Sequence, residues 1–465
     1  MTSMRRPRRP DPARRLDPAR MAAYEAVEAV HRDDAYANLV LPRILRERRV
    51  AGRDAAFATE LAYGTLRLTG TLDAVVANAA GREMARIDPP VRDALRLGAY
   101  QLLRMRVPPH AATATTVDLV RAVAPGAVGF ANAVLRRIGE RDWDAWLAAL
   151  TPPGGDPVAR LALTYAHPQW IVRAFADALG SLEETERALI ADNEPAPVHL
   201  CARPGRSTAA ELADETGGVP GPFGEYAVHL TRGAPGELRA VAEGRAHVQD
   251  EGSQLVAAAL PEVPLDGGPD ERWLDLCAGP GGKAGLLGAL AAQRGAVVTA
   301  VEVAAHRAEL VSRATAGLPV EVVCADGRTV GRDERLPERG FDRVLVDAPC
   351  TGLGALRRRP EARWRRQPSD LPALTRLQRE LLGAALRAVR PGGVVAYVTC
   401  SPHLVETRVS VGEAVRRASS TVQQLDARAL MPAGMPGLDD GPAVKLWPHR
   451  HGTDAMFLAV LRRTR

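Results

Sequence analysis

The chain has 465 residues, of which 46% are hydrophobic and 25% are charged, and its formal net charge is +6. The composition is that of a globular protein with sizeable buried cores, and the length predicts two or three domains. No run of about 18 apolar residues occurs, and no apolar segment follows the arginine-rich N-terminus, which argues against a membrane span and a secretory signal. We therefore expect a cytoplasmic protein with an anionic partner and no membrane partner.

Five cysteines are spread over the chain without a CxxC spacing. They are Cys201, Cys277, Cys324, Cys350 and Cys400. Neither a disulfide framework nor a zinc site has this pattern. We expect free thiols and no metal.

The N-terminal third of the sequence predicts a helical domain. Residues 1–17 combine arginine with proline and lack apolar periodicity, which predicts a disordered basic arm. From 18 to 142, apolar residues recur at helical spacing and clear strand alternation is absent, which predicts an all-helical bundle. Two of its apolar faces are Tyr24, Val27 and Val30, and Phe130, Val134, Leu135 and Ile138.

Two helix starts can be placed within this bundle. Asp54 is expected to cap the N-terminus of the helix that contains Phe57, because an aspartate side chain accepts hydrogen bonds from free N–H groups. Pro89 and Pro90 are expected in a first helical turn, where proline costs no hydrogen bond.

The rest of the chain predicts an α/β architecture. Between 143 and 244, proline and glycine clusters separate short apolar runs, which fits a small mixed α/β linker domain. From 245 to 465, β-rich runs alternate with helical stretches, which predicts a parallel, doubly wound Rossmann-like sheet with helices on both faces. The predicted strands are Trp273 to Ala278, Val297 to Val301, Val320 to Cys324, Phe341 to Val346 and Val394 to Val398. Ligands of such sheets bind at the carboxyl ends of the strands.

A glycine-rich turn after the first of these strands favours a nucleotide-type cofactor. Gly279, Gly281 and Gly282 allow close approach of the backbone, and a helix starting near Lys283 directs free N–H groups at a ligand. The turn does not match the Walker pattern. Glu302, at the end of the second strand, is expected to bind ribose hydroxyls, and Asp326, after the third, an adenine amino group. NAD and S-adenosylmethionine both fit such a pocket.

Two later strand ends carry the groups for covalent catalysis. Asp347 and Cys350 lie in DAPC, and Cys400 lies in TCS. A cysteine in a strand is most often a small hydrophobe, which is how Cys277 and Cys324 can be read. Two cysteines at strand exits instead suit methylation of cytosine carbon 5, which becomes nucleophilic only after a thiolate adds to carbon 6. Lys283 could lower a thiol pKa.

A basic run follows the DAPC motif. The segment from Arg357 to Arg366 holds arginine at six of its ten positions. Such a run is usually a solvated face. Because this one flanks the expected chemistry, we predict that it contacts RNA phosphates.

Three motifs resemble those of one enzyme family. DLCAGPGGK, DAPCTGLGALRRRPEARW and VTCSPHLVET look like the motifs of the Sun/RsmB (NOL/NOP/Sun) group of S-adenosylmethionine-dependent RNA 5-methylcytosine methyltransferases. The resemblance implies that Cys400 is the nucleophile, that Cys350 assists release, and that Asp347 serves both catalysis and cofactor binding. The implied cofactor contacts are Cys277, Ala278, Gly279, Pro280, Gly281, Gly282, Lys283, Glu302, Asp326 and Asp347.

The resemblance extends to the helical region. RDAAFATELAYGTLR from Arg53 and GFANAVLRRI from Gly129 are similar to a NusB-like RNA-binding domain. The implied activity is methylation of small-subunit (16S) ribosomal RNA by a monomer. The alternatives are a 5-methylcytosine methyltransferase acting on tRNA and a non-catalytic RNA-binding assembly or antitermination factor. A DNA methyltransferase is disfavoured by the helical domain and the TC motif.

Overall fold

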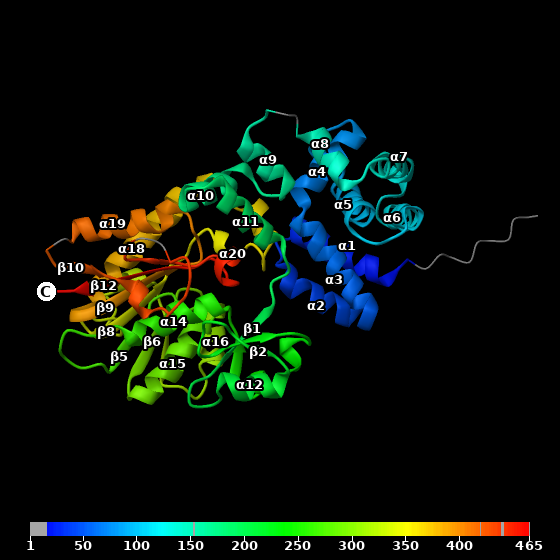
Figure 1. The fold of residues 1–465 in the computed structure, drawn as a ribbon. Helices are drawn as coiled ribbons and strands as arrows, with labels where there is room; N and C mark the ends of the chain where they lie inside the picture. The colour runs from blue at the N-terminus through cyan, green and yellow to red at the C-terminus, as the bar shows by residue number, and fades with distance from the viewer. Residues whose placement is uncertain (1–15, 152–153, 419, 439–440, 465) are drawn as a thin grey trace, which may run out of the picture. The chain divides into compact units, whose positions relative to one another are not determined.

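The computed structural model describes residues 16–151, 154–418, 420–438 and 441–464. These residues form two compact units (Figure 1). The first contains the chain up to Gln169 together with Arg359–Glu361, and the second contains the remainder. The predicted basic arm, 1–17, lies almost wholly outside the described residues. Within the described ranges, no helix is long and apolar enough to cross a membrane.

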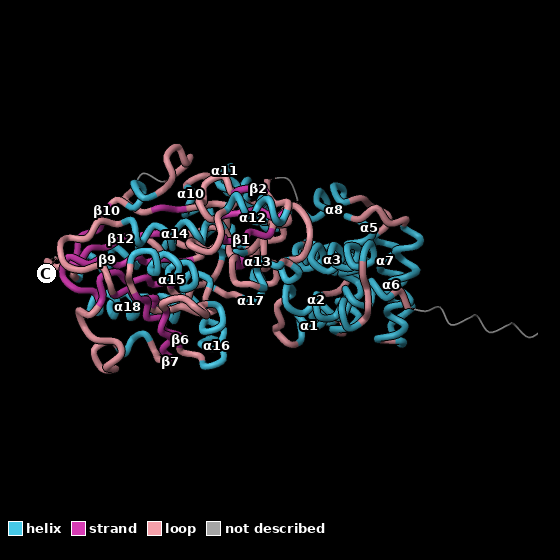
Figure 2. The backbone as a smooth tube through the Cα atoms, turned by 90° about the horizontal axis from the view of Figure 1, so that it is seen from below, coloured by secondary structure: helices cyan, strands magenta, loops and turns pink. Residues whose placement is uncertain are grey.

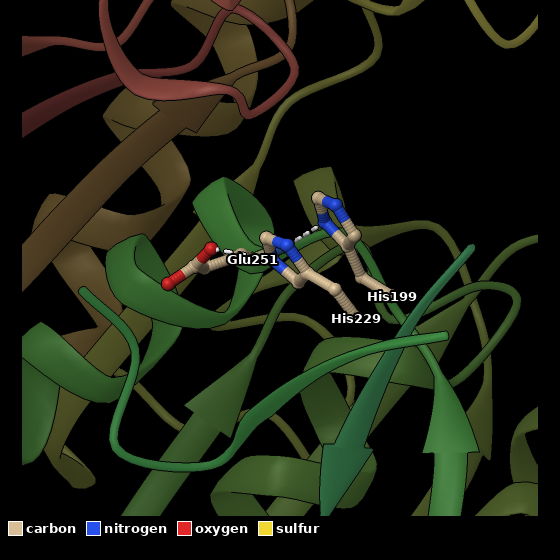
Figure 3. A group of neighbouring side chains, drawn as sticks. All are labelled: His199, His229 and Glu251. Atoms are coloured by element: carbon tan, nitrogen blue, oxygen red, sulfur yellow. Dashed lines mark hydrogen bonds and ion pairs between the residues drawn. The ribbon is translucent and has the colours of Figure 1, made fainter. Parts of the chain in front are cut away.

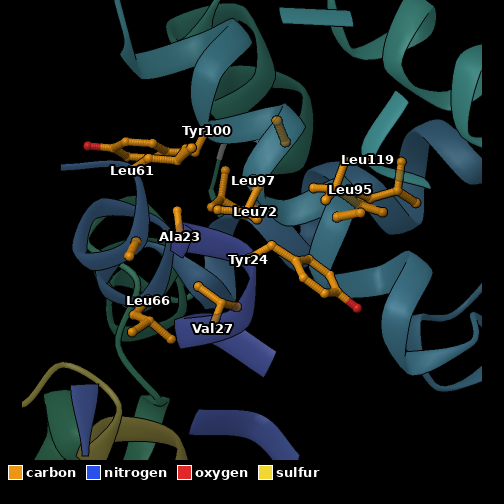
Figure 4. Packing of buried hydrophobic residues seen from close by; sticks show 14 of the residues in the cluster. Ala23, Tyr24, Val27, Leu61, Leu66, Leu72, Leu95, Leu97, Tyr100 and Leu119 are labelled. Carbon is orange, nitrogen blue, oxygen red and sulfur yellow. The ribbon is translucent and has the colours of Figure 1, made fainter. Parts of the chain in front are cut away.

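The first unit is all-helical, which confirms the predicted bundle (Figure 2). Its helices are α1 Pro18–Arg32, α2 Ala37–Glu47, α3 Gly52–Arg67, α4 Thr69–Ala80, α5 Pro89–Arg104, α6 Pro109–Val123, α7 Val128–Ile138, α8 Trp143–Leu150 and α9 Pro157–Thr164. The apolar faces read from the sequence pack into one core, where Tyr24 and Val27 of α1 lie with Leu61, Leu72 and Leu95 (Figure 4). Burial of these faces stabilises helices that are marginal in isolation.

The helix starts agree with the sequence in one case and differ in the other. Pro89 opens α5, as predicted. The prediction for Asp54 was wrong, because α3 begins two residues earlier, at Gly52, and its N-cap is Ala51. Gly52 has a positive φ of 57°, which turns the chain into the helix there. Asp54 instead lies in the first helical turn, where its negative charge favours the helix dipole.

The helical unit extends beyond residue 142. Trp146 of α8 is buried in the core of the bundle, and its Nε1 donates to the carbonyl oxygen of Ile138 at 3.0 Å. From α4, Thr71 donates its hydroxyl to the carbonyl oxygen of Leu163 in α9. Helices α8 and α9 therefore belong to the bundle and not to the linker region expected from 143. Two eight-residue helices carry too few apolar positions for periodicity to connect them to a core.

The second unit begins with a small α/β subdomain. After α10 (Gln169–Leu179) and α11 (Leu182–Asn193), four strands form an antiparallel sheet in the order β2-β3-β1-β4. They are β1 Val198–Ala202, β2 Val219–Pro220, β3 Ala227–Leu230 and β4 Ala246–Val248, with α12 Ala209–Thr216 and α13 Arg239–Ala242 between them. Leu200, Leu212 and Val228 share a separate small core. The mixed α/β character agrees with the sequence.

A larger mixed sheet has the order β10-β12-β9-β8-β5-β6-β7. Its strands are β5 Arg272–Asp275, β6 Val297–Glu302, β7 Val320–Cys324, β8 Phe341–Asp347, β9 Val389–Thr399, β10 Val422–Leu425 and β12 Phe457–Arg463, and β11 Val444–Lys445 pairs with β12. The five predicted strands are present and mutually parallel. The all-parallel prediction was wrong at one edge, since β12 runs antiparallel to β9. An apolar strand pattern does not encode the direction of the strand.

Helices cover both faces of this sheet (Figure 1). They are α14 Glu251–Glu262, α15 Gly282–Arg294, α16 Ala305–Ala314, α18 Leu371–Ala388 and α19 Arg408–Arg417. Successive strand residues alternate between two cores: Leu345 packs with Leu286 of α15, whereas Val344 packs with Leu382 of α18. Burial on both faces is why these strands are almost continuously apolar, as in other parallel sheets.

A pair of glycine substitutions tests the packing of the bundle. In Gly98→Ala, the new Cβ would lie 2.6 Å from Leu135 Cδ2 and 2.8 Å from Thr116 Cγ2. We expect this overpacking to lower the free energy of unfolding by about 1–3 kcal/mol. Gly129→Ala, at an exposed position of α7 with no atom within 4 Å of the new Cβ, is the control and should be neutral or stabilising by up to about 1 kcal/mol. Denaturant titration of the full chain measures both, and equal effects would contradict the packing.

Candidate active site

The parallel strands bring the motifs of the sequence to one edge of the sheet. Asp275 ends β5, Glu302 ends β6 and Asp347 ends β8. Register keeps these ends level, since Asp275 lies beside Leu345 in β8 and Asp347 beside Val398 in β9. Ligands of such sheets bind at this edge. The predicted site residues therefore occupy neighbouring strand ends.

The glycine turn lies directly against Glu302. A Cβ added to Gly279 would be 2.0 Å from Glu302 Oε2. Gly281, the N-cap of α15, has a φ of +109°, and a Cβ there would be 2.6 Å from Ala314 Cβ. Only glycine fits both positions. Glu302 is buried, and its Oε1 accepts a hydrogen bond from the backbone nitrogen of Ala304 at 2.9 Å.

The other turn residues support this arrangement. Ala278 donates its backbone N–H to the carbonyl oxygen of Val301 at 2.8 Å, which ties the turn to β6. Pro280 follows Gly279 through a cis peptide bond. Burial raises the pKa of the Cys277 thiol well above its usual value, and nearby acids add to the effect. Cys277 therefore has the character of a neutral, packed side chain.

Asp326 lies after β7 but is ion-paired within its own loop. Arg328 donates to it from the backbone at 2.9 Å and from the guanidinium at 2.6 Å. These hydrogen bonds hold the pKa of Asp326 below its usual value. Arg328 also reaches Glu380 at 2.8 Å. A ligand group at Asp326 would have to share the carboxylate with Arg328.

Lys283 and Asp347 form an ion pair between the glycine turn and β8. The distance from Lys283 Nζ to Asp347 Oδ2 is 2.7 Å, and the lysine side chain is 12% exposed. Burial disfavours the ammonium, but the Asp347 carboxylate outweighs that effect and raises the pKa of Lys283. The lysine is therefore charged at neutral pH. It places a cation beside the acids that end β5, β6 and β8, which are Asp275, Glu302 and Asp347. This edge of the sheet is called the cofactor edge below.

Asp275 is a further residue of this edge to which the sequence analysis gave no role. Its side chain is fully buried and its Oδ1 accepts from the Cys277 backbone nitrogen at 3.3 Å. Among the described residues, Oδ2 has no hydrogen-bond partner. Burial, and then the charge of Asp347, raise the pKa of Asp275 to about 7. An acid directly after the buried pair Trp273 and Leu274 was the available signal.

The two strand-exit cysteines are in contact. Cys350 Sγ and Cys400 Sγ lie 3.4 Å apart and both thiols are free. The hydrogen bond from Cys350 lowers the pKa of Cys400, and the Lys283 ammonium lowers it further, against the effect of burial. The same hydrogen bond, with burial, raises the pKa of Cys350 well above its usual value. These shifts favour Cys400 as the more acidic thiol of the pair and Cys350 as the donor.

The basic run after DAPC is mostly structural. Arg357 donates to Asp454 at 3.0 Å, and Arg358 donates to Asp250 at 2.8 Å and to Asp454 at 3.0 Å. Arg363 is fully buried and donates to Asn193 Oδ1 at 2.7 Å. The prediction that the run contacts RNA was wrong for these three arginines. Arg357 and Arg358 neutralise the internal acids Asp250 and Asp454, because a buried carboxylate is costly without a partner.

A second polar cluster joins the small sheet to α14 (Figure 3). The rings of His199 and His229 are stacked, with centroids 3.8 Å apart, and Glu251 Oε2 lies 2.8 Å from His229 Nε2. His199 Nδ1 accepts the Glu251 backbone N–H at 3.0 Å. Burial lowers the pKa of His199, which favours its neutral ring. Through these contacts the cluster connects β1 and β3 to the start of α14.

Two family profiles match the chain. The family described as 16S rRNA methyltransferase RsmB/F matches residues 263–462, and the NusB family matches residues 17–140. A Mycobacterium tuberculosis protein, named as a candidate methyltransferase, is 57% identical over 461 residues, which are 98% of this chain and 99% of that protein. The ribosomal RNA small subunit methyltransferase B of Salmonella typhi is 32% identical over 451 residues, covering 95% of this chain and 98% of that protein.

A solved structure shares the fold. The crystal structure of PH0851 covers 96% of this chain and 99% of its own, with a TM-score of 0.79 and 23% sequence identity. At this level of sequence identity the match shows a similar fold and nothing more.

Thiol reactivity tests the assigned direction of the Cys350–Cys400 hydrogen bond. Iodoacetamide should alkylate Cys400 at lower pH than Cys350, because the thiolate is the reactive form. Cys350→Ala removes the donor, so it should shift the alkylation profile of Cys400 to higher pH. Peptide mass spectrometry across a pH series measures both, and Cys324→Ala, at an exposed cysteine, is the control. An unshifted Cys400 profile in Cys350→Ala would contradict the assignment.

Proposed function

The chain belongs to the RsmB/F family of 16S rRNA methyltransferases, and we propose that it methylates carbon 5 of a cytosine in small-subunit ribosomal RNA. It is an S-adenosylmethionine-dependent RNA methyltransferase with an N-terminal NusB domain. The proposal adds the target atom, the covalent route and the residues. A monomer is proposed as the acting species.

Two features of the cofactor edge support the proposal that S-adenosylmethionine binds there. Gly279 leaves room beside the buried Glu302, whose carboxylate can accept hydrogen bonds from ribose hydroxyls. The N-terminus of α15 directs backbone N–H groups to the same edge. When bound, S-adenosylmethionine supplies an electrophilic methyl group. Residues Cys277 to Lys283, Glu302, Asp326 and Asp347 are proposed to hold it.

The contact between Cys350 and Cys400 carries the proposal. Methylation of an exocyclic nitrogen or a ribose oxygen needs no protein nucleophile, whereas carbon 5 of cytosine does. Two thiols 3.4 Å apart, one with a lowered pKa, supply a nucleophile and a second acid–base group at one place. This pairing beside a cofactor edge favours carbon 5.

The proposed route assigns one step to each group. Cys400 Sγ adds to carbon 6 of the ring as its thiol proton passes to N3, and Asp347 accepts a hydrogen bond from the new N3–H. The Lys283 ammonium, 2.7 Å from Asp347, fixes that carboxylate. After methyl transfer, the carbon 5 proton passes to water, the bond between Cys400 Sγ and carbon 6 breaks, and the N3 proton returns to the Cys400 sulfur, with Cys350 assisting. Reaching the base requires it to leave its stack, at a cost of about a few kcal/mol.

Tritium release is the first test. Small-subunit ribosomal RNA labelled with tritium at carbon 5 of cytosine is incubated with the protein and S-adenosylmethionine. We expect release that depends on the cofactor, because methylation replaces the carbon 5 hydrogen. The same assay on labelled tRNA tests the alternative substrate. Binding of ribosomal RNA without release from either RNA would overturn the proposal.

The two cysteines should give opposite results on a denaturing gel. Cys350→Ala is expected to accumulate a covalent RNA–protein adduct, because Cys400 still adds to the base but release is slowed. Cys400→Ala is expected to give no adduct. Cys324→Ala, at an exposed position outside the pair, should turn over without a stable adduct. The reverse pattern would exchange the roles of the two thiols.

A further inference from the structure

A buried glutamate lies behind the two cysteines. Glu406 ends the short 3₁₀ turn Leu404–Glu406, six residues after Cys400, and its residue exposure is 0%. Its Oε1 accepts from the Thr351 backbone nitrogen at 2.8 Å and from Gln378 Nε2 at 3.0 Å. Its Oε2 accepts from the hydroxyls of Thr351 and Ser401, the latter at 2.6 Å. Four donors therefore converge on one carboxylate.

These donors belong to both cysteine loops. Thr351 directly follows Cys350, and Ser401 directly follows Cys400. Gln378 of α18 also donates to the carbonyl oxygen of Pro349, on the other side of Cys350, at 2.9 Å. One side chain thus connects the DAPC loop, the TCS loop and the helix that covers them.

The backbone of Glu406 is also held in place. Tyr397 of β9 donates its hydroxyl to the backbone carbonyl of Glu406 at 2.9 Å. Thr351, Ser401 and Gln378 are all buried. Without an acceptor, each of these buried donors would lose a hydrogen bond that water cannot replace. The two loops would then relax to satisfy them separately.

We propose that Glu406 is a positioning residue that holds Cys350 and Cys400 together. It lies behind the thiols and acts through Thr351 and Ser401, not on the substrate. This inference rests on the proposed function, in which Cys400 adds to the base and Cys350 assists release. Both steps take place at carbon 6 of the ring, so both thiols must be held close to it. A displacement of about 1 Å can lower the rate of such a step by about 100-fold.

Two substitutions at Glu406 and one matched control test this role. Glu406→Ala removes all four acceptor contacts. Glu406→Gln keeps an oxygen for the two N–H donors and places its amide toward the two hydroxyls, which can accept as well as donate. The control is Asp342→Ala. Asp342 is also buried and accepts from the backbone nitrogens of Glu271 at 2.9 Å and Arg272 at 2.8 Å and from Arg390 Nε at 2.6 Å, but at the opposite end of β8.

The first readout needs no catalysis. Phenylarsine oxide bridges two adjacent thiols, forming two arsenic–sulfur bonds and releasing one water, and mass spectrometry locates the bridge. The wild type should bridge Cys350 and Cys400, whose sulfurs are 3.4 Å apart. We expect Glu406→Ala to lose the bridge, and Glu406→Gln and Asp342→Ala to keep it.

The second readout is the tritium-release rate. We expect Glu406→Ala to lower kcat by about 100-fold with unchanged S-adenosylmethionine binding, and Glu406→Gln to keep most of the activity. Retained bridging and kcat in Glu406→Ala would overturn the inference. So would losses that merely follow thermal stability and match those of Asp342→Ala.

Two further outcomes keep the test decisive. If Glu406→Ala does not fold, Ser401→Ala, which removes one donor from the TCS loop, should weaken bridging, and unchanged bridging would overturn the inference. If the wild type releases no tritium, the proposed function fails. The bridging comparison between wild type and Glu406→Ala still decides whether Glu406 positions the thiols.

Discussion

The parallel pairing of β8 with β9 is the constraint on which the active-site edge depends. Asp347 lies beside Val398, so the two strands end level and their exits carry Cys350 and Cys400 into contact. A slip of one residue would exchange the faces of every side chain in a strand. Here both faces are buried, with Val344 and Val395 in one core and Leu345 and Ala396 in the other. Packing therefore fixes the register of β8 and β9, and this register determines where Cys350 and Cys400 lie.

The charges at this edge are coupled by burial. Asp275, Glu302 and Asp347 end three neighbouring strands. Lys283 pairs with Asp347, and Arg307 lies 3.5 Å from Glu302. Burial raises the pKa of Asp275 to about 7, and repulsion from the Asp347 charge adds to the rise. The hydrogen bond from Cys350 lowers the pKa of Cys400, and the Lys283 ammonium adds to that effect, whereas burial and the Asp347 charge oppose it. Lys283 thus acts on both Asp347 and Cys400.

The sequence predicted what periodicity and strand position encode, and missed what only packing decides. Apolar spacing located the helices of the bundle and the five parallel strands. It could not give the direction of β12, because an antiparallel strand buried on both faces has the same apolar pattern. It also could not show that Arg357 and Arg363 are internal, since their partners Asp454 and Asn193 are about 97 and 170 positions away in the sequence. The roles of Cys400 and Cys350 came from resemblance, and they remain predictions.

The two lysines of this arginine-rich chain both stand at largely buried positions. The chain has 61 lysines and arginines, of which only Lys283 and Lys445 are lysine. Neither lies on the surface, since Lys445 is 6% exposed and the Lys283 side chain 12%. Among the described residues, arginine thus supplies the surface cations. A guanidinium is a planar fork that needs several acceptors, whereas an ammonium is compact and can place its charge on one carboxylate oxygen. Between the glycine turn and Asp347 there is one such oxygen, at 2.7 Å, and this geometry accounts for lysine at that position in an otherwise arginine-rich chain.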